Sequence, residues 1–489
     1  MTAILSRPAA ALLLLALYAL MCVAVWWRHR RRQQLAAAES AALLPAADSG
    51  PPVLVLHASQ TGQAEELAWQ TAKALHLAGM PVRVAALGEI DAQALKDARH
   101  ALFIASTYGE GDAPDSAAPF ARDLMAAGDG DDATALIDLS ALQVGVLALG
   151  DATYTHFCGF GRALDTWLRE RGAQSMFDRI EADRSDPAAL ATWRQHLSHF
   201  AGTADLAEWE APVFSPWRLR VRRHLNPGSQ GGPVFHLALT PADGSPLPDW
   251  EAGDLVQVLP AANANADADA SGDGDADASR PREYTICSLP ADGAVELMVR
   301  RTSREDGAPG RASGLLTEQL ALEGTVALRL RAHASFRIGA NAARPLILIG
   351  NGTGLAGLRA HLKSRAQTRM NTAHADNVSP APAWLLFGER QSAHDAHYRD
   401  EIDTWQRDGL IAHADWAFSR DQDERIHVQH LLARHAQRLR EWVADGAALY
   451  VCGSLQGMAG AVDAVLRETL GEAEVDALIR DGRYRRDVY

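Results

Sequence analysis

Cysteine is scarce in this sequence, and its four cysteines lie far apart. Cys22, Cys158, Cys287 and Cys452 form no C-x-x-C pair and no Cys/His spacing of the kind that binds metal. This pattern excludes a disulfide-stapled secreted domain and predicts thiols in a reducing compartment, with no metal site. Any special role of a cysteine must therefore come from its local context.

Positive charge is also in short supply. The 489 residues include 47 Lys and Arg against 61 Asp and Glu, which gives a net charge of −14. Nucleic-acid binding needs clustered cations, so we expect no nucleic acid as a partner. The negative field favours a cationic protein partner instead. The length suffices for about three domains at ~150 residues each.

One long apolar run stands at the N-terminus. Residues 9–27 carry no charge, and Arg28, Arg30, Arg31 and Arg32 follow them. The length is close to the ~20 residues of a spanning helix, and the positive charge predicts that the C-terminal side faces the cytoplasm. A cleaved signal peptide would carry its charge before the apolar run. We therefore predict a single-pass protein of the cytoplasmic membrane, with an anchor at 9–27 and a linker at 28–51.

Three regions with different patterns of apolar runs and turns follow the linker. Residues 52–205 and 343–489 alternate short apolar runs with helical stretches, which predicts two α/β domains with parallel, doubly wound sheets. Residues 211–335 hold short strand-like runs separated by Pro/Gly turns, which predicts an antiparallel β-barrel. Residues 261–279 form an Ala/Asp/Gly tract that reads as a surface loop. The expected strands are Val53–His57, Ala101–Ala105, Val144–Leu149, Val234–Leu239, Leu255–Leu259, Val295–Arg300, Val326–Leu330, Leu346–Ile349, Trp384–Phe387 and Leu449–Val451.

Three turns in the first domain offer small polar residues where strands end. A phosphate at a strand-to-helix turn needs hydroxyls, backbone N–H donors and a helix N-terminus. The first turn, residues 59–64, has small hydroxyl residues before a helical stretch. It has no lysine, which excludes a P-loop. The other two turns each add a tyrosine that could stack on a flat ring, Tyr108 and Tyr154. The candidate residues are Ser59, Gln60, Thr61, Gly62, Gln63, Ala64, Ser106, Thr107, Tyr108, Gly109, Gly150 and Tyr154.

The three turns together resemble the flavodoxin-like FMN domain of the diflavin reductases. The resemblance implies that 59–64 hold the FMN phosphate, that Tyr108 and Tyr154 flank the isoalloxazine ring, and that Asp183 lies near the ribityl chain. Residues 51–205 hold 21 acidic and 11 basic residues, a net of −10 that suits docking to a basic patch on an electron acceptor.

The barrel region contains Arg282-Glu283-Tyr284-Thr285-Ile286-Cys287-Ser288, which resembles the FAD signature of the ferredoxin-NADP reductase superfamily. The resemblance implies that Arg282 pairs with the FAD pyrophosphate, that Tyr284 stacks on the flavin and that Thr285 reaches its N5 atom. Ser288 completes the signature. A second pyrophosphate loop is expected at Gly310, Ala312 and Ser313.

The last domain contains a glycine-rich turn and a later basic segment. Gly352, Thr353 and Gly354 follow a strand, where glycines let a pyrophosphate approach the backbone. A 2′-phosphate needs cations and hydroxyls, so NADPH rather than NADH is expected at the basic segment. The family often has Lys where Arg425 stands and Tyr where His427 stands. The expected contacts are Ser419, Arg420, Arg425, His427 and Gln429.

The catalytic residues are expected from two segments. Cys452 ends a strand, which by the resemblance brings its thiol near the nicotinamide. The C-terminus Gly482-Arg483-Tyr484-Arg485-Arg486-Asp487-Val488-Tyr489 most resembles the sulfite reductase flavoprotein subunit. The resemblance implies that Tyr489 stacks on FAD and moves aside for the nicotinamide, and that Asp487 lies beside Cys452 and Thr285.

These features predict an NADPH-dependent diflavin reductase that passes electrons from NADPH to FAD, to FMN and then to a haem, iron–sulfur or other one-electron acceptor. The acceptor is expected to be a haemoprotein or a sulfite reductase haem subunit. Two alternatives stay open: a membrane-associated ferric-chelate or flavin reductase, and a non-catalytic anchored subunit of a redox complex. One departure is large, since the family normally has a helical connecting domain where this chain has only residues 261–279.

Overall fold

The computed structural model describes residues 51–109, 111–126, 137–152, 154–184, 186–203, 213–260, 281–304, 307–372 and 381–489. The predicted anchor at 9–27, almost all of the linker and the 261–279 tract lie outside these residues. Within the described residues, no helix combines the length and the apolar character needed to cross a membrane. On this finding we correct the predicted localisation in the cytoplasmic membrane, which was wrong.

The chain forms two compact units, with the boundary between residues 209 and 210. The first unit has a parallel sheet in the order β2-β1-β3-β4, and both β5 and β6 pair with β4. Its strands are β1 (Val53–Ala58), β2 (Val82–Ala86), β3 (His100–Ser106), β4 (Gln143–Gly150), β5 (Gln174–Ser175) and β6 (Ile180–Asp183). Its helices are α2 (Gln63–Leu77), α3 (Ala92–Asp97), α4 (Ala118–Phe120), α5 (Gly159–Glu170) and α6 (Pro187–Ala201).

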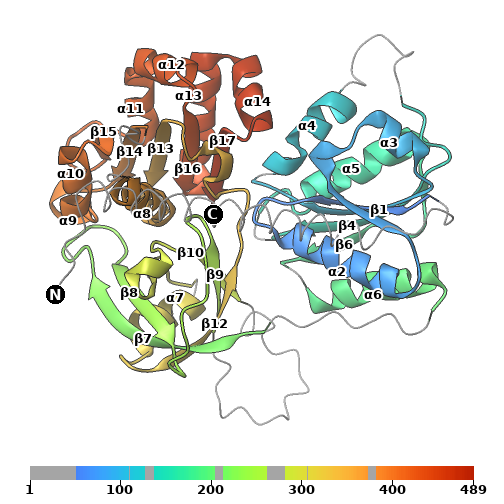
Figure 1. Ribbon diagram of the computed structural model, residues 1–489, viewed down its shortest axis with the longest axis horizontal. Coiled ribbons are helices and arrows are strands. Elements are labelled where there is room, and N and C mark those ends of the chain that lie inside the picture. Colours follow the sequence, from blue (N-terminus) through green and yellow to red (C-terminus); the bar gives the residue numbers. More distant parts are fainter. Residues whose placement is uncertain are drawn as a thin grey trace, which may run out of the picture. The chain divides into compact units, whose positions relative to one another are not determined.

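Both faces of this sheet are covered by helices, with α2 and α6 on one face and α3, α4 and α5 on the other (Figure 1). Successive residues of β1 serve opposite faces: Val53 and Val55 pack toward α2, whereas Leu54 and Leu56 pack toward α5. A strand buried on both faces reads as a continuous apolar run, which is why the sequence shows no alternation here.

The second unit begins with an antiparallel sheet in the order β10-β9-β12-β7-β8-β11. The strands of the predicted barrel are therefore present, and an additional Arg-rich strand, β7, lies among them. The bounds are β7 (Ser215–His224), β8 (Val234–Pro241), β9 (Leu255–Leu259), β10 (Arg282–Thr285), β11 (Val295–Arg300) and β12 (Thr325–Arg331), with α7 (Arg311–Gly314) between the last two.

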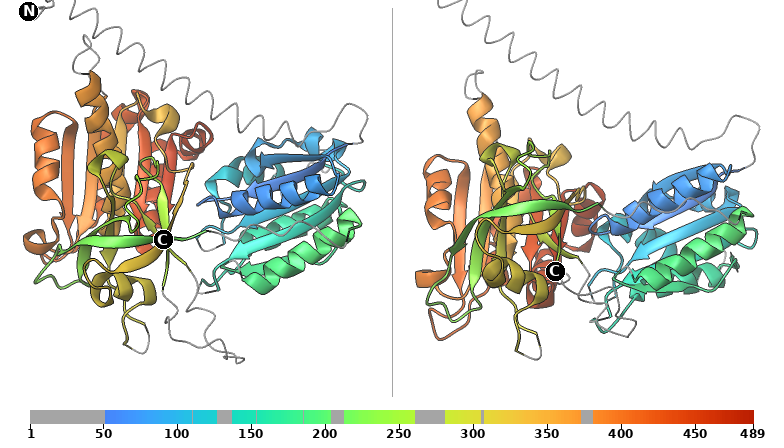
Figure 2. Two further views of the ribbon diagram at one scale, coloured as in Figure 1. Left: turned by 60° about the horizontal axis from the view of Figure 1, so that its bottom comes forward. Right: turned by 90° about the horizontal axis from the view of Figure 1, so that it is seen from below.

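A parallel sheet in the order β15-β14-β13-β16-β17 completes the second unit. Its strands are β13 (Leu346–Asn351), β14 (Ala383–Glu389), β15 (Ile411–Phe418), β16 (Ala448–Gly453) and β17 (Tyr484–Val488). Helices α8 (Leu355–Thr372), α9 (Ser392–Asp395) and α10 (Arg399–Arg407) lie on one side, and α11 (Val428–Arg434), α12 (Ala436–Ala444), α13 (Gly460–Leu470) and α14 (Glu472–Arg480) lie on the other (Figures 1 and 2).

One hydrophobic core joins this sheet to the antiparallel sheet. Val234, Cys287 and Met298 of the barrel region belong to the same buried cluster as Leu348 and Tyr450 of the parallel sheet. The two domains predicted at 211–335 and 343–489 therefore pack as a single compact unit. The expected strands are all present, with some ends extended by one or two residues, whereas β17 was not predicted.

Candidate functional site

Three polar turns meet at one edge of the first sheet. They follow β1, β3 and β4, which are neighbours and run parallel, so their carboxyl ends share an edge. Ligands of doubly wound sheets bind at this edge. The structure therefore brings the predicted residues 59–64, 106–109, Gly150 and Tyr154 to this edge.

The first turn leads into the N-terminus of α2. Gly62 has a φ of 89°, in the left-handed region that favours glycine, and its N–H donates to Ser59 Oγ at 2.8 Å. Behind it, the Ser59 N–H donates to Ser116 Oγ at 2.9 Å, and Gln60 exchanges two hydrogen bonds with Asp115, each of 3.0 Å. The turn is thus braced from behind, and the first-turn N–H groups of α2 are oriented for an anion.

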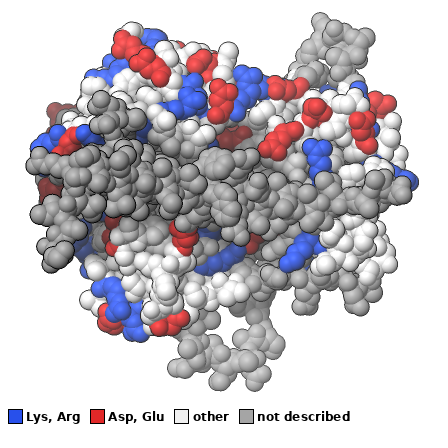
Figure 3. Space-filling view, in the orientation of Figure 1, with Lys and Arg blue, Asp and Glu red and all other residues white. Residues whose placement is uncertain are grey.

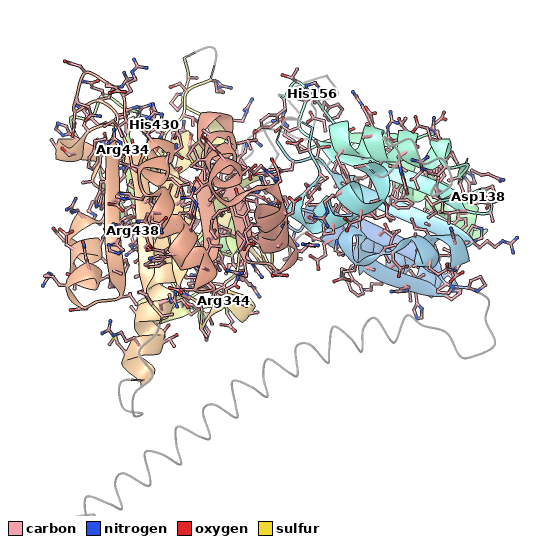
Figure 4. The ribbon with its side chains drawn as sticks, turned by 90° about the horizontal axis from the view of Figure 1, so that it is seen from above. Asp138, His156, Arg344, His430, Arg434 and Arg438 are labelled. Carbon is pink, nitrogen blue, oxygen red and sulfur yellow. The ribbon has the colours of Figure 1, made fainter. Side chains whose placement is uncertain are left out.

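The two tyrosine turns pack closely on each other. Tyr108 is buried and closes a short turn with Asp112 through backbone hydrogen bonds of 2.9 and 2.8 Å, whereas Tyr154 is partly exposed. A Cβ on Gly159, which begins α5, would lie 2.8 Å from the Cα of Gly111, so the backbones of the two loops nearly touch. In Figure 4, His156 marks the loop of Tyr154.

Asp183 and Gly150 shape the third turn. Asp183 ends β6 beside Gly150, and its Oδ1 accepts from the Ala152 N–H at 3.0 Å. A Cβ on Gly150 would lie 2.6 Å from the nitrogen of Cys158, so this position requires glycine. The Thr107 hydroxyl is buried without a hydrogen-bond partner among the described residues. A buried hydroxyl of this kind fits a site that receives a polar ligand, as FMN would be.

The FAD signature runs along β10 and the turn after it. Arg282 and Tyr284 are partly exposed, whereas Thr285 is buried. Ser288 is fully buried, and its hydroxyl donates to the Ala294 carbonyl at 2.9 Å and accepts from the Glu296 N–H at 2.9 Å. Its hydroxyl thus serves the turn between β10 and β11, so its predicted contact with a cofactor gains no support from the geometry.

The second pyrophosphate loop begins α7. The Gly310 N–H donates to the Thr302 carbonyl at 2.8 Å, and a Cβ on Gly310 would lie 2.3 Å from Thr302 Oγ1. Ser313 shares a hydrogen bond of 2.8 Å with Thr302 Oγ1, and Ala312 packs into the barrel core. Glycine at position 310 therefore lets the start of α7 lie close to Thr302.

The glycine-rich turn after β13 lies directly against the end of β16. A Cβ on Gly354 would meet the Cys452 carbonyl oxygen at 2.0 Å, and Gly352 has a φ of 56°. The turn continues into α8, whose third residue, Gly357, also packs closely. A Cβ there would lie 3.3 Å from Cys452 Sγ and 3.2 Å from Thr285 Cγ2. Glycine at 357 thus lets α8 lie closely over Thr285 and Cys452.

The predicted 2′-phosphate residues gather between β15 and α11. Ser419 and Arg420 follow β15 directly, while Arg425, His427 and Gln429 stand at the start of α11. Burial lowers the pKa of His427, and the neighbouring His430, Arg425 and Arg420 lower it further. Figure 4 shows His430, Arg434 and Arg438 following this segment along α11 and α12. This electrostatic setting suits a phosphate.

The C-terminal strand β17 completes the predicted catalytic site. It pairs in parallel with β16, with Asp487 beside Cys452. Asp487 Oδ2 accepts from the Thr285 hydroxyl at 2.7 Å and from Cys452 Sγ at 3.5 Å. All three side chains are buried. Thr285, Cys452 and Asp487 therefore meet as the sequence predicted, although 202 positions separate Thr285 from Asp487.

Tyr489 lies at the mouth of this site. Its backbone N–H donates to the Gly453 carbonyl at 3.1 Å, and its hydroxyl donates to Thr353 Oγ1 at 3.1 Å. The side chain is 52% exposed, so the terminal ring covers the glycine-rich turn without being enclosed.

Two arginines that the sequence reasoning missed lie at the ends of their strands. Arg300 ends β11, and its Nη2 lies 3.5 Å from the position of a Cβ on Gly352. Arg390 follows β14; its buried Nη1 has no hydrogen-bond partner among the described residues and lies 2.0 Å from the position of a Cβ on Gly231. A cation placed at the carboxyl end of a strand could have been noticed from the segment Phe387-Gly388-Glu389-Arg390. Arg300 therefore lies beside the glycine-rich turn, where a guanidinium fits a phosphate.

Comparison with known families agrees with this geometry. The flavodoxin family matches residues 55–194, and the oxidoreductase NAD-binding domain family matches residues 348–464. The sulfite reductase [NADPH] flavoprotein alpha-component of Neisseria meningitidis serogroup C is 28% identical, and the alignment covers 89% of each chain. The proteins of the same name from Bacillus subtilis and Shigella boydii are each 26% identical, with 91% of this chain covered.

The alignment with the Neisseria protein runs over 555 positions, more than the 489 residues of this chain. That relative therefore carries inserted residues that this chain lacks, which agrees with the short 261–279 segment.

In its two folds, its two family matches and these relatives, the chain is similar to the diflavin reductases. It is an NADPH-dependent flavoprotein oxidoreductase whose cofactors are FMN, FAD and NADPH, with FMN held by the flavodoxin-like unit.

Proposed function

We propose that this chain takes a hydride from NADPH at Thr285, Cys452 and Asp487, and passes single electrons through FMN to a haem protein of the sulfite reductase type. The single observation that carries the proposal is Asp487, which holds the Thr285 hydroxyl and the Cys452 thiol on one carboxylate oxygen. When bound, the two flavins supply two-electron uptake and one-electron release.

The protein holds Cys452 as a neutral thiol. Burial and the adjacent Asp487 carboxylate both raise the pKa of Cys452 well above its usual value. The sulfur therefore keeps its proton at neutral pH and does not act as a thiolate nucleophile. A neutral thiol and a hydroxyl fixed by one carboxylate can orient a nicotinamide ring without adding a second negative charge to the site.

Tyr489 has to move when the nucleotide binds. Its hydroxyl bond to Thr353 places it over the Gly352–Gly354 turn, where a pyrophosphate would approach. The side chain is half exposed, so its movement breaks few contacts. We expect Tyr489 to gate nicotinamide access to the flavin.

The choice of acceptor rests on the relatives and on charge. The relatives are named as flavoprotein components of sulfite reductase. Residues 51–205 carry a net charge of −10, and Figure 3 shows acidic side chains of the flavodoxin-like unit at the surface. A negative unit that holds FMN suits an acceptor with a positive docking patch.

The test combines two measurements on the full chain. Anaerobic titration with NADPH should bleach both flavins. The reduced protein should then reduce a sulfite reductase haem subunit faster than it reduces ferric citrate, and added salt should slow the haem reaction. Bleaching of one flavin type only would refute the two-flavin path. Equal rates with both acceptors would refute the haem protein as the acceptor.

A further inference from the structure

Three ligand-type side chains converge at the carboxyl end of β14, outside the hydride-transfer site. Glu389 ends β14, Asp395 ends α9, and His397 stands in the turn before α10. Their ligand atoms all lie within 4.8 Å of one another. The residues are 9%, 0% and 2% exposed. We call these three residues the β14-end cluster.

His397 is the side chain whose chemistry is unexplained. Among the described residues, neither of its ring nitrogens has a hydrogen-bond partner. Nε2 points at Glu389 Oε1 from 3.7 Å, which is too far for a hydrogen bond. Two ligand atoms that each lie ~2.1 Å from one tetrahedral ion are about 3.4 Å apart. The 3.7 Å between His397 Nε2 and Glu389 Oε1 is close to that distance, so both atoms could bind one metal ion.

The rest of the cluster is held in place from outside. Asp395 accepts hydrogen bonds from Asn226 Nδ2 at 3.0 Å, Ser229 Oγ at 2.9 Å and the Gln391 N–H at 3.1 Å. On the other side of His397, Tyr398 has a φ of 53° and bonds His236 Nδ1 through its hydroxyl at 3.0 Å. The imidazole therefore sits on a fixed turn, as a metal ligand needs.

The charge balance of the cluster favours a cation. Glu389 forms an ion pair with Arg300, but the hydrogen-bond donors to Asp395 in the described part of the chain are all neutral. Burying an anion without a cation is costly.

We propose that Glu389, Asp395 and His397 bind one zinc-like divalent transition-metal ion. One imidazole nitrogen and two carboxylate oxygens suit Zn²⁺ and leave a coordination position open. Glu389 Oε1 lies 3.8 Å from the position of a Cβ on Gly352, so the ion would sit beside the dinucleotide turn. No local sequence motif marks this site, because its residues are spaced by six and two positions and Asp395 depends on Asn226 and Ser229.

A second cluster of similar composition serves as a contrast. The ligand atoms of His236, Cys287 and Glu296 also lie within 4.8 Å of one another. Arg359 contacts both the carboxylate and the thiol there, with Nη1 2.7 Å from Glu296 Oε2 and 3.6 Å from Cys287 Sγ. At the β14-end cluster, Arg300 pairs with Glu389, whereas Asp395 receives only neutral donors from the described residues. We therefore assign the metal to the β14-end cluster, whose coordination would contain no sulfur.

The experiment measures metal content on the full flavin-containing chain. The protein is dialysed against a chelator, incubated with excess Zn²⁺, passed over a desalting column and analysed by mass spectrometry for zinc. We expect one zinc per chain, and X-ray absorption at the zinc edge should show nitrogen and oxygen ligands with no sulfur. His397→Leu should weaken zinc binding by more than ~100-fold, beyond the usual cost of losing an outer-sphere partner.

The matched control is His361→Leu. His361 on α8 is also fully buried, and neither of its ring nitrogens has a partner among the described residues, but it belongs to neither metal-type cluster there. This variant removes an equally buried imidazole and should keep the zinc. If it lost the zinc as His397→Leu does, the loss would reflect packing, and the assignment would be overturned.

Arg300→Gln gives a second readout that a purely structural network would not produce. Arg300 competes with a metal ion for Glu389 Oε1, so its removal should tighten zinc binding by about tenfold. If the cluster were only an ion-pair network, the same change would give no zinc binding at all. A wild-type chain that retains no zinc, or that shows sulfur ligands, would overturn the proposal.

Discussion

The two units build their sites in opposite ways. In the flavodoxin-like unit, every predicted FMN contact lies at the carboxyl end of a strand, on the turn after it or at the start of the helix that follows. In the second unit, the hydride-transfer site joins β10 to the C-terminal strand across 202 positions. The first site is set by local turn chemistry, while the second is set by how β17 docks beside β16. Damage to one site should therefore leave the other intact.

The largest effect is expected from Asp487→Ala. The change leaves the Thr285 hydroxyl and the Cys452 thiol without their common acceptor. Stopped-flow measurement of FAD reduction by NADPH should show a rate lower by roughly 10²–10³-fold. FMN content should not change, because all of its predicted ligands lie in the other unit.

Asp487→Asn keeps the shape of the side chain and serves as the matched control, and its rate should fall between those of Asp487→Ala and the wild type. A rate for Asp487→Ala within threefold of the wild type would remove Asp487 from the site. Loss of FMN from either variant would break the independence of the two units.

A pair of glycine substitutions tests the comparison from both sides. In Gly354→Ala the new Cβ would lie 2.0 Å from the Cys452 carbonyl oxygen, and in Gly150→Ala it would lie 2.6 Å from the nitrogen of Cys158. Each should destabilise its own unit by about 1–3 kcal/mol or more. Gly354→Ala should impair NADPH binding but retain FMN, and Gly150→Ala should do the reverse, as flavin analysis and NADPH titration can measure.

Gly460→Ala is the control for both substitutions. Gly460 begins α13, and a Cβ there would meet nothing within 4 Å. Alanine in a helix should be neutral or stabilise by up to ~1 kcal/mol. If Gly150→Ala or Gly354→Ala behaved like this control, the close contacts described above would not require glycine at that position.

The smallest effect concerns acid stability of the first unit. Burial lowers the pKa of His57, near the end of β1, from 6.5 to about 4. The unfolded chain therefore binds a proton at a higher pH than the folded chain does, and folding stability falls as the pH drops from 6.5 toward 4. Between pH 6.5 and 5.5 this histidine should cost about 1 kcal/mol.

His57→Gln should remove that part of the pH dependence, measured as FMN release in urea at the two pH values. His199→Gln, at an exposed position on α6, is the matched control and should keep the wild-type slope. An unchanged slope in His57→Gln would show that His57 titrates normally.

The sequence predicted most of the fold because most strands here are continuous apolar runs that end in turn residues. It placed Ser59–Ala64, Gly352–Gly354 and Cys452 correctly at strand ends. It did not predict β17, whose Arg-rich sequence has no strand-like apolar pattern, nor the structural hydrogen bonds of Ser288. Arg300 was missed because nothing nearby in the sequence shows that it lies beside the glycine turn at Gly352.

What the sequence alone determined is therefore local: apolar strands, glycines at tight turns, and small polar residues at helix starts. These follow from backbone sterics and hydrogen bonding within a few residues. Only the tertiary structure decided that Gly357 lies over Cys452 and that His397 faces Glu389, whereas the meeting of Asp487 with Thr285 was predicted through the family resemblance. Such meetings depend on the register of distant strands and the packing of a shared core, which no short stretch of sequence encodes.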